Sequence, residues 1–157
     1  MIIFGVDPSC CKCGVSVVEV DQSSRIKILI CDTLCLPSRM PLQDRLAQLH
    51  DRFTGFIHEC RPHCIALETP FLGKNAQQFL KLGYVRGILY VLASQHELLL
   101  REFAPREVKA AITGYGGATK EQVATVLGHL FPHMVKPERF DATDSLAVAL
   151  CAAFMLR

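Results

Sequence analysis

The sequence predicts an α/β domain with one mixed, five-stranded sheet flanked by helices. Short β-branched runs alternate with longer segments whose apolar residues recur every three to four positions, which is the spacing of amphipathic helices. The 157 residues are close to the ~150 typical of one domain, and no linker or repeat divides them. Because strands and helices alternate through the chain, the helices are expected to cover a sheet. We therefore expect residues 1–157 to form a single domain.

The first three strands are predicted at residues 1–7, 14–20 and 26–31, which are short and rich in Val and Ile. A tight connection at 8–13 and a turn at 21–24 separate them, so they form a hairpin meander. A helix follows over 42–57, and a buried strand, 64–68, comes next.

The second half is predicted to contain a helix over 75–94 and a strand over 98–103, followed by two helices. Thr119 caps the first of these with Gln122 three residues on, a capping box, and 141–156 forms the last. Gly83 and Gly87 lie on one face of the 75–94 helix, where glycine costs stability. We expect them to allow a close approach to a neighbouring backbone.

The composition excludes several classes of protein. Half of the residues are hydrophobic and a fifth are charged, with a net charge of +2, which argues against disorder and against DNA binding by bulk charge. No apolar run reaches the ~18–20 residues of a membrane span, and the N-terminus lacks the basic region of a signal peptide. A cytoplasmic, reducing location is expected.

Eight cysteines need an explanation in such a compartment. They are Cys10, Cys11, Cys13, Cys31, Cys35, Cys60, Cys64 and Cys151. Their spacing contains no C-x2-C pair and no following His pair at zinc-finger spacing. We predict inert buried thiols, and structural zinc stays open as the alternative.

Four acids are the sharpest chemical signal. Asp7 and Glu68 each end an apolar strand, and Asp141 and Asp144 lie at i and i+3 in the first turn of the last helix. Four such carboxylates can converge, and oxygen ligands favour Mg²⁺. Two ions ~3.5–4 Å apart would clamp the oxygens of a phosphodiester. The alternatives are a helix-dipole role for Asp141 and Asp144, a turn at Asp7 and a surface ion pair at Glu68.

The charge is unevenly distributed along the chain. The segment Leu72–Lys120 carries a net charge of +4, and the rest carries −2. This asymmetry fits a phosphate-binding face beside an acidic metal site, although an ordinary solvated surface would give the same pattern.

Motifs in order along the whole chain resemble the RuvC family of Holliday junction resolvases. They are Ile3-Phe4-Gly5-Val6-Asp7-Pro8 with Gly14-Val15, Ala66-Leu67-Glu68 with Phe71, Lys74-Asn75-Ala76, Lys81-Leu82-Gly83 with Arg86-Gly87, residues 104–109, Gly114 to Gly117, Lys120-Glu121-Gln122-Val123 and residues 141–147. Ser9 stands where the family usually has glycine, and Thr143 and Ser145 stand where alanine is commoner. Cys10-Cys11-Lys12-Cys13 replaces a more polar turn, so the first loop is where the chain departs most from the family.

The resemblance implies an RNase H-like fold and a homodimeric, Mg²⁺-dependent endonuclease, with Mn²⁺ as a substitute, that nicks two opposed strands of four-way junction DNA in recombination and repair. It assigns catalysis and metal binding to Asp7, Glu68, Asp141 and Asp144. DNA contacts are expected from Phe71, Lys74, Lys81, Arg86, Lys109 and Lys120. It also implies a branch-migration motor complex as partner, and the Gly83/Gly87 face is a candidate dimer interface.

Two other classes of function remain open from the residues alone. A strand, an acid and a tight turn also open actin-like kinases, although that fold needs two such domains. The other class is a catalytically silent junction-binding or zinc-stabilised interaction module.

Overall fold

Five strands form one mixed sheet in this computed structural model, which describes residues 1–70, 76–132 and 140–156. The strands are β1 (Ile2–Asp7), β2 (Lys12–Val20), β3 (Ile26–Cys35), β4 (Cys64–Glu68) and β5 (Leu99–Phe103). Their order is β3-β2-β1-β4-β5, antiparallel from β3 to β1 and parallel from β1 to β5. The predicted fold class is therefore confirmed.

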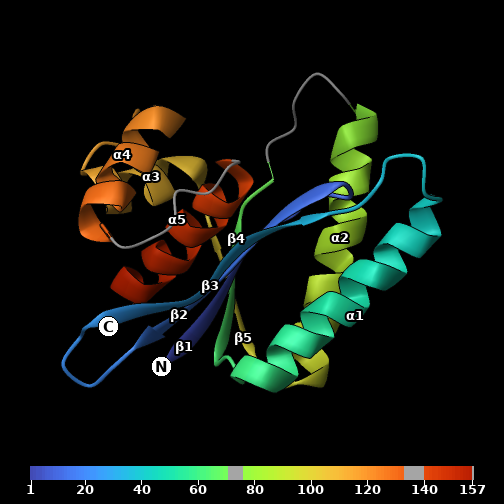
Figure 1. Cartoon of the computed structure of the whole chain (residues 1–157), viewed down its shortest axis with the longest axis horizontal. Helices are drawn as coiled ribbons and strands as arrows, with labels where there is room; N and C mark the ends of the chain where they lie inside the picture. Colours follow the sequence, from blue (N-terminus) through green and yellow to red (C-terminus); the bar gives the residue numbers. More distant parts are fainter. Residues whose placement is uncertain (71–75, 133–139, 157) are drawn as a thin grey trace.

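Helices cover both faces of the sheet (Figure 1). They are α1 (Leu42–Cys60), α2 (Ala76–Gln95), α3 (Pro105–Thr113), α4 (Lys120–Leu130) and α5 (Phe140–Met155). The helices α1 and α2 lie on one face, and α3, α4 and α5 lie on the other. Each face buries its own apolar cluster, one beneath α1 and α2 and one beneath α5. No helix in the described ranges is long and apolar enough to span a membrane.

The predicted element order lacks α3, and this is a correction. The nine-residue helix begins at Ala104, which has no side-chain oxygen to cap it. Instead Glu107 accepts a hydrogen bond from the backbone N–H of Ala104 at 2.6 Å. Pro105 at the first helical position, with Val108 and Ile112 buried four residues apart, was the available signal.

Two further expectations need correction. The third strand runs on to Cys35 because its antiparallel pairing with β2 continues to Lys12. Gly83 and Gly87 make no close approach within the described chain, since a Cβ added at either position would meet nothing within 4 Å. The Thr119–Gln122 capping box is confirmed.

The helix α5 lies very close to the sheet, and two glycines make this possible. A Cβ on Gly5 would lie 2.5 Å from the carbonyl oxygen of Ser145, and one on Gly14 would overlap the carbonyl oxygen of Asp141. Beneath the helix, Ser16 and Ser145 share a buried hydrogen bond of 2.7 Å between their hydroxyls. These contacts fix where the first turn of α5 sits relative to β1 and β2.

All eight cysteines are free thiols, but they are not uniformly buried. Cys10, Cys13, Cys64 and Cys151 are buried as predicted, whereas Cys35 is exposed because the edge strand β3 turns it to solvent. Burial raises the pKa of Cys13 to about 12 and that of Cys64 to about 11. These thiols are protonated and unreactive at neutral pH.

Candidate active site

Asp7 and Glu68 meet at one edge of the sheet because β1 and β4 are parallel neighbours. The pairing runs from Ile3 opposite Cys64 to Val6 opposite Leu67, so the acids that end the two strands leave the sheet together. Both side chains are half-buried. The sequence prediction that these two acids face a common site is thus supported by the strand register.

The first turn of α5 brings Asp141 and Asp144 to the same edge. Asp141 lies directly over Gly14, the residue paired with Asp7 across β1 and β2. Asp144 forms an ion pair with Lys120, the first residue of α4. Four acids from three elements are therefore gathered with one lysine among them.

The pKa values of Asp7 and Glu68 are shifted by burial and by the neighbouring charges. Burial, then the negative charges of Asp144, Glu68 and Asp141, raise the pKa of Asp7 from 3.8 to about 7, although Lys120 opposes the shift. Burial and Asp144 also raise the pKa of Glu68, against Lys120 and Lys109. Burial is the largest cause for both acids, and the neighbouring carboxylates add to it.

Lys120 and Lys109 supply the positive charge at this edge. Burial lowers the pKa of Lys120, but the hydrogen bond and charge of Asp144 outweigh it, so the net shift is upward. A cavity of about 60 Å³ is lined by both lysines together with Glu68 and Asp144. Lys120 therefore stays charged, and both lysines, from which the resemblance implies DNA contacts, adjoin Glu68 and Asp144.

The donor set at this edge fits a hard divalent cation. Carboxylate oxygens are the ligands that Mg²⁺ prefers, and a cation would relieve the repulsion that raises the pKa of Asp7. In the described ranges, however, no three His, Cys, Asp or Glu side chains converge closely enough to hold an ion. The four carboxylates lie near one another but do not form a complete set of metal ligands, and Asp144 is paired with Lys120.

The loop between β1 and β2, residues 8–11, is anchored by a buried arginine that sequence reasoning missed. Arg45 donates to the carbonyl of Cys10 at 3.4 Å and to the sulfur of Cys11 at 2.8 Å. Its spacing from Leu49 and Phe53, four and eight residues on, placed it on the buried face of α1 and was the available signal. Ser9 does not adopt a positive φ, so replacing the family's glycine leaves this backbone unstrained.

Arg86, one of the predicted DNA-binding residues, lies inside the fold. The residue is only 4% exposed, and its side chain forms an ion pair with Glu102. It also donates to the carbonyl of Glu68 at 2.7 Å and to the hydroxyl of Tyr90 at 3.0 Å. The guanidinium is therefore committed inside the fold, where it fixes the end of β4 and the backbone of Glu68.

The remaining predicted DNA contacts fall in different places. Lys81 is exposed on α2, and its carbonyl accepts a hydrogen bond from Cys10, so it lies beside the loop that follows Asp7. Phe71 and Lys74 lie outside the described residues.

Known proteins match this chain over nearly its whole length. A family profile described as "Crossover junction endodeoxyribonuclease RuvC" matches residues 3–152. The protein of that description from Pelodictyon phaeoclathratiforme is 42% identical over 151 residues, covering 96% of this chain and 78% of the relative. The one from Chlamydia pneumoniae is 32% identical over 158 residues, covering 99% and 94%.

Solved structures give the same picture. "T. thermophilus RuvC in complex with Holliday junction substrate" superimposes with a TM-score of 0.91 at 28% identity, covering 100% of this chain and 95% of that one. The yeast mitochondrial Holliday junction resolvase matches with a TM-score of 0.67 at 14% identity, covering 96% and 77%. The second likeness concerns the fold alone.

Proposed function

The chain belongs to the RuvC family of crossover junction endodeoxyribonucleases, and we propose that it resolves four-way DNA junctions by paired, symmetric nicks. The observation that carries this proposal is the gathering of Asp7, Glu68 and Asp144 beside Lys120 at one sheet edge. A catalytically silent junction binder would not need these half-buried, mutually repelling acids. We further propose a cytoplasmic location.

In the proposed mechanism, Asp7, Glu68, Asp141 and Asp144 would hold Mg²⁺, with Mn²⁺ as a substitute. Bound ions, two in the proposed site, would supply Lewis-acid stabilisation and an activated water for in-line attack on the phosphodiester. Lys109 and Lys120 stabilise negative charge on the scissile phosphate. Arg86 keeps the carboxylate of Glu68 in place through the Glu68 carbonyl. A 5′-phosphate and a ligatable 3′-hydroxyl are the expected products.

The direct test is a labelled synthetic four-way junction incubated with Mg²⁺. We expect two opposed strands to be cut symmetrically into products that DNA ligase reseals, while linear duplex DNA stays intact. A junction left uncut in varied sequence contexts would contradict the proposal. ATP hydrolysis without cleavage would indicate an actin-like enzyme, and stoichiometric zinc in the purified, inactive protein would indicate an interaction module.

Lys109→Ala is predicted to slow cleavage more than it weakens junction binding. Loss of one donor to the developing phosphate charge costs about 10²-fold in rate, whereas one lost lysine–phosphate contact weakens binding modestly. Single-turnover cleavage and a binding titration of the same junction in Ca²⁺ measure the two effects.

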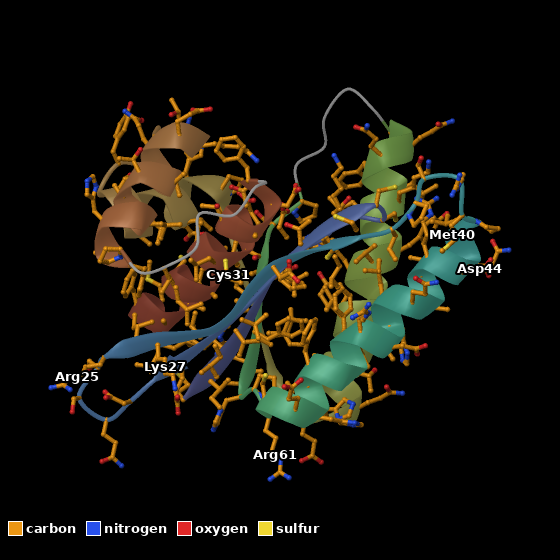
Figure 2. All side chains as sticks on the ribbon, in the orientation of Figure 1. Arg25, Lys27, Cys31, Met40, Asp44 and Arg61 are labelled. Carbon is orange, nitrogen blue, oxygen red and sulfur yellow. The ribbon has the colours of Figure 1, made fainter. Side chains whose placement is uncertain are left out.

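The matched control is Lys27→Ala. Figure 2 places Lys27 close to Arg25 at the β2–β3 hairpin. Because Ile2 at the start of β1 pairs with Glu19, this hairpin lies at the end of the sheet away from the four acids. We expect the control to leave the cleavage rate unchanged. If Lys109→Ala reduced rate and binding equally, Lys109 would be only a phosphate anchor.

We further propose that the chain acts as a homodimer joined through the outer face of α2. Leu80, Tyr84 and Val91 are 57%, 41% and 52% exposed along this helix. They alternate with Gly83 and Gly87, beside which the chain itself leaves open space. Clustered exposed apolar side chains mark interaction surfaces, and a two-fold dimer would match a two-fold junction. A branch-migration motor complex is the further partner that family membership suggests.

Val91→Asp is expected to separate the dimer because it places an unpaired charge in an apolar contact. Sedimentation velocity should show a monomer, and the two nicks should lose their coupling on a plasmid-borne junction. Leu130→Asp is the matched control, since Leu130 is 51% exposed on α4. A wild-type monomer, or equal effects of the two changes, would refute this interface.

A further inference from the structure

A pocket of about 420 Å³ lies where α1 and α2 end, remote from the acids. The chain there leads through His63, whose backbone N–H donates to the carbonyl of Ile2, into the start of β4. Asp7 and Glu68 stand at the other ends of β1 and β4. The pocket is therefore separate from the candidate active site.

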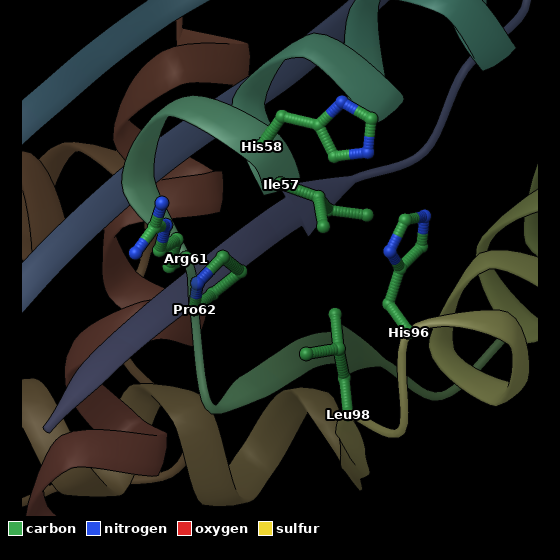
Figure 3. Close-up of a pocket in the computed structure, with 6 residues that line it drawn as sticks. All are labelled: Ile57, His58, Arg61, Pro62, His96 and Leu98. Carbon is green, nitrogen blue, oxygen red and sulfur yellow. The ribbon is translucent and has the colours of Figure 1, made fainter.

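Two histidines face each other across this pocket (Figure 3). His58 lies in the last turn of α1, and His96 directly follows α2. Their ring centroids are 5.3 Å apart at an interplanar angle of 75°, so each ring turns an edge or a face toward the other. The two rings are in edge-to-face contact, so a shared ligand would sit beside the pair, in the pocket, and not between the rings.

The nitrogen atoms of both imidazoles are available. Neither ring makes a hydrogen bond to a protein group in the described part of the chain, whereas Nδ1 of His63 accepts from the backbone N–H of Ile2 at 3.0 Å. His50 likewise lies 3.2 Å from Asp51. A neutral imidazole with an unused lone pair is a metal ligand.

The helix dipoles at the pocket favour a cation over an anion. Two helix C-termini converge on the pocket, and each is the negative end of its helix dipole. The guanidinium of Arg61, another lining residue, is turned away from both rings (Figure 3).

We propose that His58 and His96 bind one divalent transition-metal ion of the Zn²⁺ or Ni²⁺ class, with water as the remaining ligands. Imidazole nitrogen suits such ions, whereas Mg²⁺ requires oxygen ligands and does not compete. The ion would join the ends of α1 and α2, which are distant in the unfolded chain. Binding to the folded state alone stabilises it.

The test is a Ni²⁺ titration of the full chain with reduced thiols, in excess Mg²⁺ to occupy the acidic site. At about 100 times the dissociation constant, Ni²⁺ is expected to raise the wild-type Tm by about 5 °C or more. His58→Gln and His96→Gln should each lose this shift, and the control His50→Gln should keep it. Junction cleavage in Mg²⁺ should be unchanged in all three variants.

Equal Ni²⁺ responses from the wild type and all three variants would overturn the proposal and assign the ion to thiols or acids. A second measurement uses the wild type alone and so does not depend on how the variants fold. Substoichiometric Ni²⁺ should broaden the imidazole NMR signals of His58 and His96 before those of His50 and His129. Simultaneous broadening of all four would also refute the site.

Discussion

Asp7→Asn is expected to abolish junction cleavage and, in EDTA, to make the protein more stable than the wild type. The amide side chain would offer one neutral oxygen where the proposed metal site needs a carboxylate. Metal-ion catalysis contributes several kcal/mol to such reactions, so we expect a loss of about 10³-fold or more. The gain in stability has a separate cause. The Asp7 carboxylate is half-buried and repelled by the neighbouring acids, and the neutral amide removes both costs.

The pH dependence follows from the raised pKa of Asp7, about 7 in the folded chain against 3.8 ordinarily. Below pH ~4 the carboxyl is protonated in both states and costs nothing. Between ~4 and ~7 the folded state keeps a proton that the unfolded state releases, so wild-type stability falls as pH rises. Above ~7 the cost is complete, with an upper limit of ~4 kcal/mol at 1.36 kcal/mol per pKa unit.

Urea unfolding in EDTA at pH 5 and pH 8 measures this effect. The advantage of Asp7→Asn over the wild type should be larger at pH 8, by roughly 1–3 kcal/mol. Mg²⁺ should then raise the stability of the wild type but not that of the variant. Asp51→Asn is the control, because Asp51 is 81% exposed on α1. Normal cleavage by Asp7→Asn would contradict the site, and a less stable variant in EDTA would contradict the electrostatic account.

Most of the fold was predictable because apolar residues recur in its strands and helices with the spacing typical of each. Four strands and the helices α1, α2 and α5 are close to their expected positions, since apolar alternation and three-to-four spacing report burial directly. The helix α3 was missed because its start relies on Glu107 reaching back to Ala104, a contact that no capping residue announces. The last residues of β3, 32–35, were not predicted as strand because their pairing with β2, rather than their own β-propensity, keeps them extended.

The gathering of the four acids at one sheet edge was predictable from their places at strand and helix ends, whereas their surroundings were not. Nothing in the sequence around Arg86 shows that Glu102 and the Glu68 carbonyl bury its charge, because both partners are distant in the chain. The hydroxyl of Ser145 similarly finds Ser16 only in the folded state. This contact accounts physically for a serine where relatives commonly have alanine.

Gly14→Ala is predicted to displace the first turn of α5 and to disable the enzyme. The added Cβ would overlap the carbonyl oxygen of Asp141 and lie 2.5 Å from its carbonyl carbon. Both are backbone atoms, so no side-chain rotation relieves the clash. Either β2 or the helix must shift, and Gly14 is paired with Asp7 across the sheet. The change therefore separates the acids of α5 from those of the sheet.

We expect the change to destabilise the chain by about 3 kcal/mol, since overpacking a tight contact typically costs 1–3 kcal/mol or more. A displacement of 1 Å at reacting groups costs about 10²-fold in rate. Urea unfolding gives the first quantity, and single-turnover junction cleavage gives the second. Cleavage must be measured at a temperature where circular dichroism shows the variant to be folded, so that a lower rate reports misplaced acids rather than unfolded protein.

Gly55→Ala separates the steric clash from the general effect of replacing a glycine. Gly55 lies on the exposed side of α1, and its added Cβ would meet nothing within 4 Å. Alanine there should stabilise the helix by up to ~1 kcal/mol and leave cleavage unchanged. Opposite signs for the two substitutions would show that the contact between Gly14 and Asp141 sets the position of the acidic helix. If Gly14→Ala kept wild-type stability and cleavage, α5 could move away from the sheet at no cost in free energy. The activity of the acids would then not depend on close packing of α5 against β2.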